Sequence, residues 1–474
     1  MQNLSQNTLF RTLLLFISTS VFAAKTNRLN ILLIMADDQG YGDTGFSGHP
    51  TLKTPHMDSI AANGIIFDRF YASAPVCSPT RASVMTGRNP IRVNVPNHGH
   101  YLRPHEITIA EALKSAGYVT GHFGKWHIGS VQGDSPTSPG GAGFDEWLSG
   151  LNFFDIDPYL SRNGKFEQIK GQGSVIAMDA TIEFLKKHSG EEKPIFAVTW
   201  FPAPHAPHNE KPVGLPDGIQ PYEGKNSGYY REIQLIDQQL GRLRSALREM
   251  DIAENTLLWY TSDNGGLVME HSGGRDRKGS IYEGGLRVPS ILEWPTKYKS
   301  KKINVPAYSS DIYPTLLGIT GTTVENQPRL DGVDLTEIIS GAKTKRPAMG
   351  FWHQFTNGQS TWNDRIIRTL MEAQKKGKDN PHPERLLKNV NQFPKLTKGQ
   401  YNGHAAWNQW PWKLHRIQSR GNVKLELYNL EKDPMEATDL SLKQPERTKS
   451  MRTDLEAWQA SVFNSLEGKD YSKK

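Results

Sequence analysis

The residue with the most distinctive chemistry in this chain is Cys77, the only cysteine among 474 residues. It lies in the stretch APVCSPTRASVMTGR, where Pro79 follows two positions later and Arg81 four positions later. A proline is tolerated in the first turn of a helix, so this stretch predicts a helix that begins at or just after Cys77 and ends before Gly87. Arg81 is one turn beyond Cys77 and therefore shares its helix face. Because a helix N-terminus also presents free N–H groups, an anion would be favoured beside the thiol.

Two groups of oxygen-bearing side chains follow short apolar runs. The run from Leu29 to Met35 is followed by Asp37 and Asp38, and the run in NTLLWYTSDNGG is followed by Asp263 and Asn264. Three carboxylates and one amide form a hard, oxygen-only ligand set, which suits Ca²⁺ or Mg²⁺ rather than Zn²⁺. Without a cation, three anionic groups at one point would repel one another.

Basic and imidazole side chains follow other strand-like segments. The stretch GYVTGHFGKWHIG carries Lys125 and His127, the stretch KPIFAVTWFPAPHAPH carries His205, and Lys278 lies in GRDRKGSIYEGGLRVPS. In open α/β sheets, ligands bind just beyond the carboxyl ends of strands. We therefore expect Lys125, His127 and His205 to meet the acidic groups at one site.

Each of these residues also has a purely structural interpretation. A lone cysteine is often a small buried hydrophobe, paired aspartates commonly end strands and cap turns, and lysines in loops are usually solvated. Only the combination of several such segments favours a catalytic site.

The segments between the strands have helical periodicity. TIAEALKSAG, residues 108 to 117, has a capping box from Thr108 to Glu111 and a stop at Gly117. Residues 228 to 250 repeat apolar side chains at spacings of three and four, which forms one apolar helix face. Strands that alternate with such helices predict an α/β fold with a large, mostly parallel sheet sandwiched by helices.

Together the quoted motifs resemble the formylglycine-dependent sulfatase family, part of the alkaline phosphatase-like superfamily. Cys77, Pro79 and Arg81 match its C-x-P-x-R signature, G-K-W-H-x-G is present around Lys125, and K-G-x-x-Y-E-G-G-x-R-x-P begins at Lys278. The resemblance implies that a maturation enzyme oxidises Cys77 to formylglycine. It also implies that the modified residue and four oxygen ligands hold one divalent cation, Ca²⁺ in preference to Mg²⁺. Those four residues are Asp37, Asp38, Asp263 and Asn264.

The resemblance also implies a role for each remaining residue. One hydroxyl of an aldehyde hydrate attacks sulfur, activated by Asp263 or the metal, and the other hydroxyl later expels sulfate once His127 has taken its proton. His205 and Lys278 protonate or stabilise the leaving alcohol. Two further residues, Arg81 and Lys125, orient and polarise the formylglycine.

The chain is predicted to be an exported, soluble protein of three parts. Residues 1–23 combine Arg11, a short apolar run and a small-residue cleavage site, which is typical of a signal peptide, and the run is shorter than a membrane span requires. Residues 24–340 are predicted to form the catalytic domain. Residues 341–474 are predicted to form a smaller α+β subdomain with an antiparallel sheet and a terminal helix. A single cysteine excludes an internal disulfide.

The prediction of the substrate rests on the composition of residues 360 to 420 and on the segments that match no family motif. Residues 360 to 420 hold 12 Lys and Arg against 4 Asp and Glu, interleaved with tryptophans. Nucleic-acid binding and a plain solvated surface are the conventional alternatives, but for an exported sulfatase a sulfated glycan fits better. Residues 131 to 175 and 354 to 410 match nothing in the family, so we expect substrate selection there. The rival functions are an arylsulfatase, a phosphate or phosphonate ester hydrolase, and a noncatalytic glycan-binding homologue.

Overall fold

The computed structural model describes residues 29–208, 220–388, 399 and 401–471. The predicted signal peptide, residues 1–23, lies outside the described residues. Among the helices that are described, none combines the length and the apolar character that a membrane crossing needs.

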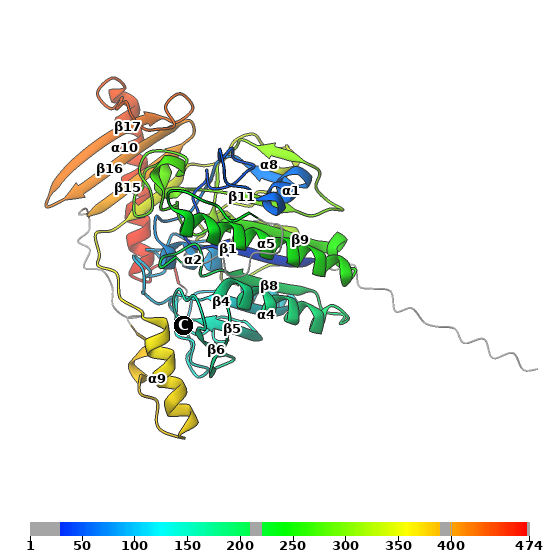
Figure 1. The fold of residues 1–474 in the computed structure, drawn as a ribbon. Coiled ribbons are helices and arrows are strands. Elements are labelled where there is room, and N and C mark those ends of the chain that lie inside the picture. The colour runs from blue at the N-terminus through cyan, green and yellow to red at the C-terminus, as the bar shows by residue number, and fades with distance from the viewer. Residues whose placement is uncertain (1–28, 209–219, 389–398, 400, 472–474) are drawn as a thin grey trace, which may run out of the picture.

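The centre of the described structure is a ten-stranded sheet (Figure 1). In spatial order its strands are β12 (Lys301–Ile303), β2 (Ile65–Phe67), β11 (Ser290–Glu293), β9 (Thr256–Ser262), β1 (Asn30–Ala36), β8 (Ile195–Trp200), β4 (Val119–Lys125), β5 (Glu146–Gly150), β6 (Tyr159–Arg162) and β7 (Lys165–Gln168). The five strands from β9 to β5 all run parallel, and antiparallel pairs occur toward both edges. The four strands predicted to carry site residues are four neighbours in this parallel core. Their carboxyl ends therefore lie together at one edge.

Alternate residues of β1 pack into two separate apolar cores. Ile31, Leu33 and Met35 belong to one core, whereas Leu32 and Ile34 belong to the other. Because successive side chains of a strand point to opposite faces, the sheet is covered on both sides.

Different helices cover the two faces of the sheet. The first core takes in side chains of α2 (Cys77–Thr86), α3 (Ile109–Ser115), α7 (Ile312–Thr320), α8 (Thr336–Ser340) and α9 (Asn363–Lys375). The second core takes in side chains of α1 (Pro55–Asn63), α4 (Gly173–His188) and α5 (Ser227–Glu249), and Figure 1 shows α4 and α5 side by side next to the sheet.

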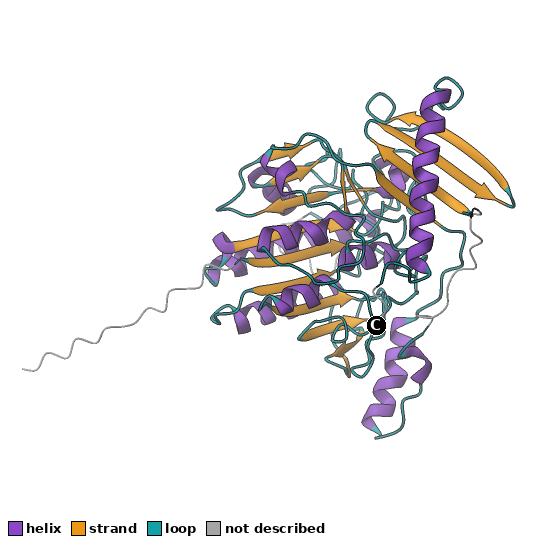
Figure 2. Cartoon of the chain, turned by 180° about the vertical axis from the view of Figure 1, so that it is seen from behind, coloured by secondary structure: helices purple, strands orange, loops and turns teal. Residues whose placement is uncertain are grey.

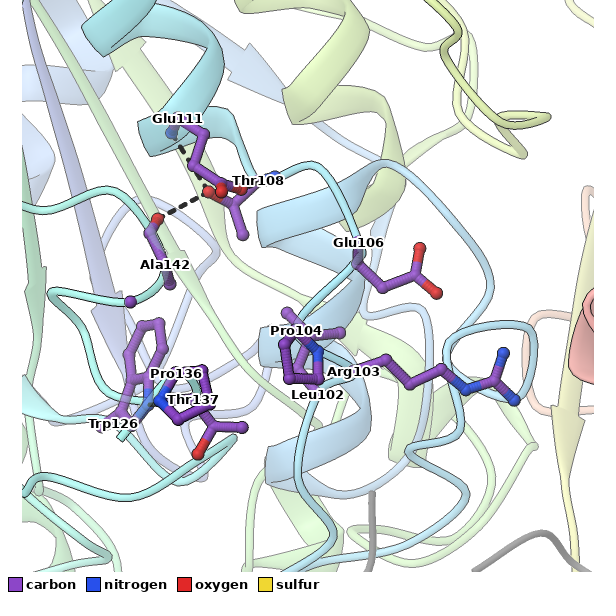
Figure 3. A pocket seen from close by; sticks show the side chains of 11 residues that line it. Leu102, Arg103, Pro104, Glu106, Thr108, Glu111, Trp126, Pro136, Thr137 and Ala142 are labelled. Atoms are coloured by element: carbon purple, nitrogen blue, oxygen red, sulfur yellow. Dashed lines mark hydrogen bonds between the residues drawn. The ribbon is translucent and has the colours of Figure 1, made fainter. Parts of the chain in front are cut away.

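The helix boundaries follow the local sequence signals. Helix α2 begins at Cys77 and ends at Thr86, with Gly87 in the left-handed region at φ 67°. The predicted capping box of α3 is present: the Glu111 amide donates to Thr108 Oγ1 at 3.1 Å, and the Thr108 amide donates to Glu111 Oε2 at 2.8 Å. The Thr108 hydroxyl also donates to the Ala142 carbonyl at 2.7 Å (Figure 3).

A smaller antiparallel sheet lies at the C-terminal end of the chain. Its strands are β14 (Met349–His353), β15 (Gly403–Gln409), β16 (Trp412–Ser419) and β17 (Asn422–Asn429), and α10 (Pro445–Leu466) packs along β15 and β16 (Figure 2). A third, three-stranded sheet joins β10 (Arg287–Val288), β3 (Phe70–Tyr71) and β13 (Ala307–Tyr308). The predicted α/β architecture with a small C-terminal antiparallel sheet is confirmed. The predicted division after residue 340 stays a prediction.

Candidate active site

The N-terminus of α2 meets the ends of β4 and β9 through Arg81. The guanidinium donates from Nε and Nη2 to Asp263 Oδ2, at 3.1 and 2.7 Å, and from Nη1 to the Lys125 carbonyl at 3.0 Å. Its side chain and that of Asp263 are fully buried. Arg81 therefore holds three segments of the chain in place around Cys77.

Three potential metal ligands converge at this point. Ligand atoms of Asp37, Cys77 and Asp263 all lie within 4.8 Å of one another, and all three residues are buried. Within the described residues, Asp37 Oδ1 and Asn264 Oδ1 are buried and have no hydrogen-bond partner. Buried oxygen atoms without a donor are costly, and a cation would satisfy them.

Asp38 has different partners from Asp37. Its carboxylate accepts from Lys278 Nζ at 2.6 Å and from Asn264 Nδ2 at 2.8 Å. Asp37, by contrast, accepts from Lys125 Nζ at 2.6 Å. The structure therefore brings all the sequence-predicted ligands together, but Asp38 lies beside the three-residue cluster, with its carboxylate already paired.

The pKa values of Asp37 and Asp263 are shifted in opposite directions. Burial raises the pKa of Asp37, but Lys125 and the other cations around it outweigh burial and hold that pKa well below its usual range. Burial, followed by the charge of Asp37, raises the pKa of Asp263 in spite of Arg81. Opposite shifts in neighbouring acids are the result of like charges competing for one site.

The donor set fits the divalent cation that the resemblance implies. It consists of carboxylate and amide oxygens with unsatisfied atoms, together with residue 77. Asp37, Asp263 and Asn264 would hold the ion, with Asp38 adjacent. A hard cation there would supply positive charge to neutralise an anionic ester.

The two predicted histidines lie on the open side of this cluster. His127 is buried, and neither ring nitrogen has a hydrogen-bond partner within the described part of the chain. Burial and the charge of Lys125 hold the pKa of His127 well below its usual value, so the ring is neutral. His205 Nε2 lies 3.8 Å from Asp38 Oδ2, and its ring stacks on Phe153 at 4.3 Å between centroids.

A pocket of about 500 Å³ opens over these groups. Cys77, His127, His205 and Lys278 line it together with Trp362, one of the tryptophans of the basic stretch in which the sequence predicts glycan binding. The lining residues that sequence reasoning did not name are His98, Asn152, Phe153, Ser360 and Thr361. Of these, all but His98 come from the two segments without family motifs. No motif identifies these residues. The only signals in the sequence were that residues 131 to 175 and 354 to 410 lack family motifs and that the latter segment is rich in tryptophan.

A separate, small cavity is lined in part by Trp126 of the G-K-W-H segment (Figure 3). It measures about 10 Å³ and is bordered by Arg103, Glu106 and Glu111. A space of that size holds about one water molecule. It is too small to hold a substrate.

Comparison with known proteins gives a consistent answer. The Sulfatase family model matches residues 29–322. The chain is 31% identical to N-acetylgalactosamine-6-sulfatase of Canis lupus familiaris, over 67% of this chain and 67% of that protein. It is 30% identical to arylsulfatase A of Homo sapiens, over 73% of this chain and 74% of that protein.

A solved structure has a similar fold. That of Ps i-CgsB in complex with k-i-k-neocarrahexaose has a TM-score of 0.70 and 25% identity, and covers 91% of this chain and 92% of that chain. The family match spans the whole ten-stranded sheet, including Asp37, Cys77 and Asp263. The chain thus belongs to the sulfatase family, and it is a sulfuric ester hydrolase.

Proposed function

We propose that this protein removes sulfate from a sulfated carbohydrate, using a formylglycine made from Cys77 and a bound Ca²⁺. The observation that carries the proposal is the 500 Å³ pocket, in which residue 77 lies with Lys278 and three histidines. The described residues that line this pocket include no carboxylate, and the aspartates around residue 77 are each paired with a lysine or an arginine. Positive charge is therefore available to an anionic ester there.

The names of related proteins support a carbohydrate substrate. They include N-acetylgalactosamine-6-sulfatase and the ulvan-active sulfatase of Formosa agariphila, which is 29% identical over 65% of each chain. The pocket is also wide enough for a sugar ring and has the aromatic side chains Phe153 and Trp362 in its wall.

The residues of this chain have separable tasks in sulfate ester hydrolysis. Lys278 and Lys125 place positive charge beside the ester oxygens, and each is held by its own aspartate. The pKa of His127 is held low, and among the described residues neither of its ring nitrogens has a hydrogen-bond partner, so it is the candidate to accept a proton from residue 77. His205 is the candidate donor to the leaving alcohol.

Formylglycine would supply a geminal diol as nucleophile, which a thiol cannot. Burial raises the pKa of the Cys77 thiol although Lys125 and Lys278 oppose the shift, so an unmodified thiol would be protonated and weakly nucleophilic. Cys77 is only 4% exposed. A maturation enzyme would therefore reach it before the chain folds.

Export is part of the same proposal. Residues 1–23 have the composition of a signal peptide, and a sulfated polysaccharide would be met outside the cytoplasm. Sequencing the N-terminus of protein isolated from its native host tests this directly. We expect the mature chain to begin near residue 24, and a chain that retains Met1 would contradict export.

The activity test compares esters on one protein preparation. The protein is produced together with a formylglycine-generating enzyme, and the release of inorganic sulfate is measured from defined sulfated oligosaccharides and from an aryl sulfate. An aryl phosphate and a Cys77→Ala variant are the controls. We expect sulfate from at least one oligosaccharide and none from the variant.

Two results would overturn parts of the proposal. Turnover of aryl sulfate without any oligosaccharide would remove the carbohydrate assignment, and faster release of phosphate than of sulfate would favour the rival ester class. Mass spectrometry of the peptide that holds residue 77 addresses the nucleophile: an active protein with an intact thiol would exclude formylglycine.

A further inference from the structure

A second pocket adjoins the one that contains Cys77. It measures about 300 Å³, and its wall includes Asp155, Asp364 and Arg365. Phe153 and Trp362 line both pockets, which therefore lie next to each other. Neither the motifs nor the roles assigned above make use of this second space.

Trp362 forms a fixed, exposed surface between the two pockets. Its side chain is 61% exposed, which is unusual for so large an apolar group. The residues on both sides anchor it: the Thr361 carbonyl accepts from Asn152 Nδ2 at 3.0 Å, and Asn363 Oδ1 accepts from the Leu151 amide at 2.7 Å. The backbone is thus held while the indole faces solvent, as expected of a ligand platform rather than of a core residue.

Phe153, the other shared residue, links the second pocket to the chemistry. Its ring is nearly parallel to the His205 imidazole, with an angle of 14° between the planes. A ligand that spans both pockets would therefore pass the proposed proton donor. In addition, Asn152 Oδ1 is buried and without a hydrogen-bond partner within the described structure.

The two pockets differ in charge. The first presents Lys278 and three histidines, and its described lining has no carboxylate. The second presents the carboxylates of Asp155 and Asp364 against one guanidinium, that of Arg365. Carboxylates accept hydrogen bonds from hydroxyl groups but repel a sulfate.

We propose that the second pocket binds the sugar unit next to the sulfated one and selects a neighbour that carries hydroxyls but no sulfate. The inference rests on the proposed function, because it takes the substrate to be a sulfated carbohydrate. Trp362 and Phe153 provide the apolar surface on which the linked units lie. Asp155 and Asp364 provide the selection against a second sulfate.

The test uses three substrates and measures kcat/KM for each. They are a disaccharide with one sulfate on the reacting unit, the same disaccharide with a second sulfate on the neighbouring unit, and a small aryl sulfate. We expect the parent enzyme to prefer the singly sulfated disaccharide by about tenfold or more at low salt. All values are expressed relative to the aryl sulfate rate of the same protein.

Two variants and one control examine the residues. The double variant Asp155→Asn with Asp364→Asn should raise the ratio of kcat/KM for the doubly sulfated disaccharide to kcat/KM for the singly sulfated one by about threefold to tenfold. Trp362→Ala should raise KM for the disaccharide by about tenfold. Glu372→Gln replaces an exposed carboxylate on the same helix, α9, outside both pockets and should change neither ratio. Should the double variant not fold, Asp364→Asn alone provides the test, since Asp364 is exposed.

The outcomes separate this inference from the proposed function. If the parent hydrolyses the aryl sulfate but treats both disaccharides alike, or if the double variant matches Glu372→Gln, the second pocket does not select the neighbouring unit and the inference is wrong. If the parent hydrolyses no sulfate ester at all, the proposed function fails and this inference fails with it.

Discussion

Replacement of Lys413 by methionine should destabilise the protein through a buried ion cluster that ties the C-terminal sheet to the larger part of the fold. Lys413, on β16, donates to Glu283 Oε1 at 2.9 Å and lies 3.1 Å from Glu436 Oε1. All three side chains are nearly or completely buried. Glu283 begins the short helix α6 (Glu283–Leu286), five residues after Lys278.

The loss in free energy of unfolding depends on which partners the two buried carboxylates keep after the substitution. Each carboxylate keeps a neutral donor: Tyr71 to Glu283 at 2.9 Å, and the Glu283 amide to Glu436 at 2.6 Å. Neither keeps its buried ammonium partner, and removing one partner of a buried ion pair costs about 3–5 kcal/mol. At about 2.1 cal/mol/K of unfolding entropy per residue, a chain of 474 residues loses about 3–5 °C in Tm.

The loss should depend on pH in a defined direction. Burial raises the pKa of Glu436, and Lys413 is the largest influence that opposes this shift. Without Lys413 the pKa in the folded state rises further above the unfolded value. The folded variant then binds more protons than the unfolded chain, so its stability falls as the pH rises from the unfolded pKa toward the folded one. The loss of stability in Lys413→Met relative to the parent should therefore be larger at pH 8 than at pH 5.

Differential scanning calorimetry of both proteins at one scan rate measures this effect. The matched control is Lys170→Met, which removes a lysine 79% exposed and paired with Asp157 at 2.8 Å. An exposed pair contributes little, so the control should show almost no shift in Tm. A Lys413→Met variant that melts within 1 °C of the parent (about the size of a surface effect) would falsify the reasoning about the buried cluster.

Three further predictions concern the active site. Lys278→Met should lower kcat/KM on an aryl sulfate by about 100-fold or more, because it removes a positive charge from the ester site. Circular dichroism checks that the variant is folded. A rate equal to that of the parent would exclude Lys278 from catalysis. Dialysis against a chelator should lower both activity and Tm, and added Ca²⁺ should restore them, since a ligand of the native state stabilises it. If protein shown to be metal-free keeps its activity and its Tm, the cation is not needed. Phe153→Leu should reduce kcat several-fold with little change in Tm, because leucine offers His205 no flat surface, whereas Phe153→Tyr should retain the rate. Equal rates in the leucine and tyrosine variants would mean that stacking does not position His205.

Much of the site could be predicted from the sequence because its determinants are local. The start of α2 at Cys77, the left-handed stop at Gly87 and the Thr108 capping box each depend on a few adjacent residues. The apolar run of β1 identifies a strand buried on both faces, and a parallel sheet places such strands' carboxyl ends together. The meeting of Asp37 and Asp263 at Cys77 could thus be expected although more than 180 residues separate Asp263 from the other two.

Other features depend on which distant segments the fold brings into contact, and no local pattern encodes them. Lys413 counts in the sequence among the cations of a basic stretch, yet the packing of β16 against α6 buries it between two carboxylates. Trp362 and Phe153 belong to segments without motifs, and only the placement of α9 beside the site makes them neighbours. The sequence by itself therefore determined the family, the sheet and the residues that meet at the candidate site, because these follow from short-range spacing and strand periodicity. The tertiary structure decided the shape and charge of the substrate pockets, because those depend on loop paths and on contacts between residues far apart in the chain.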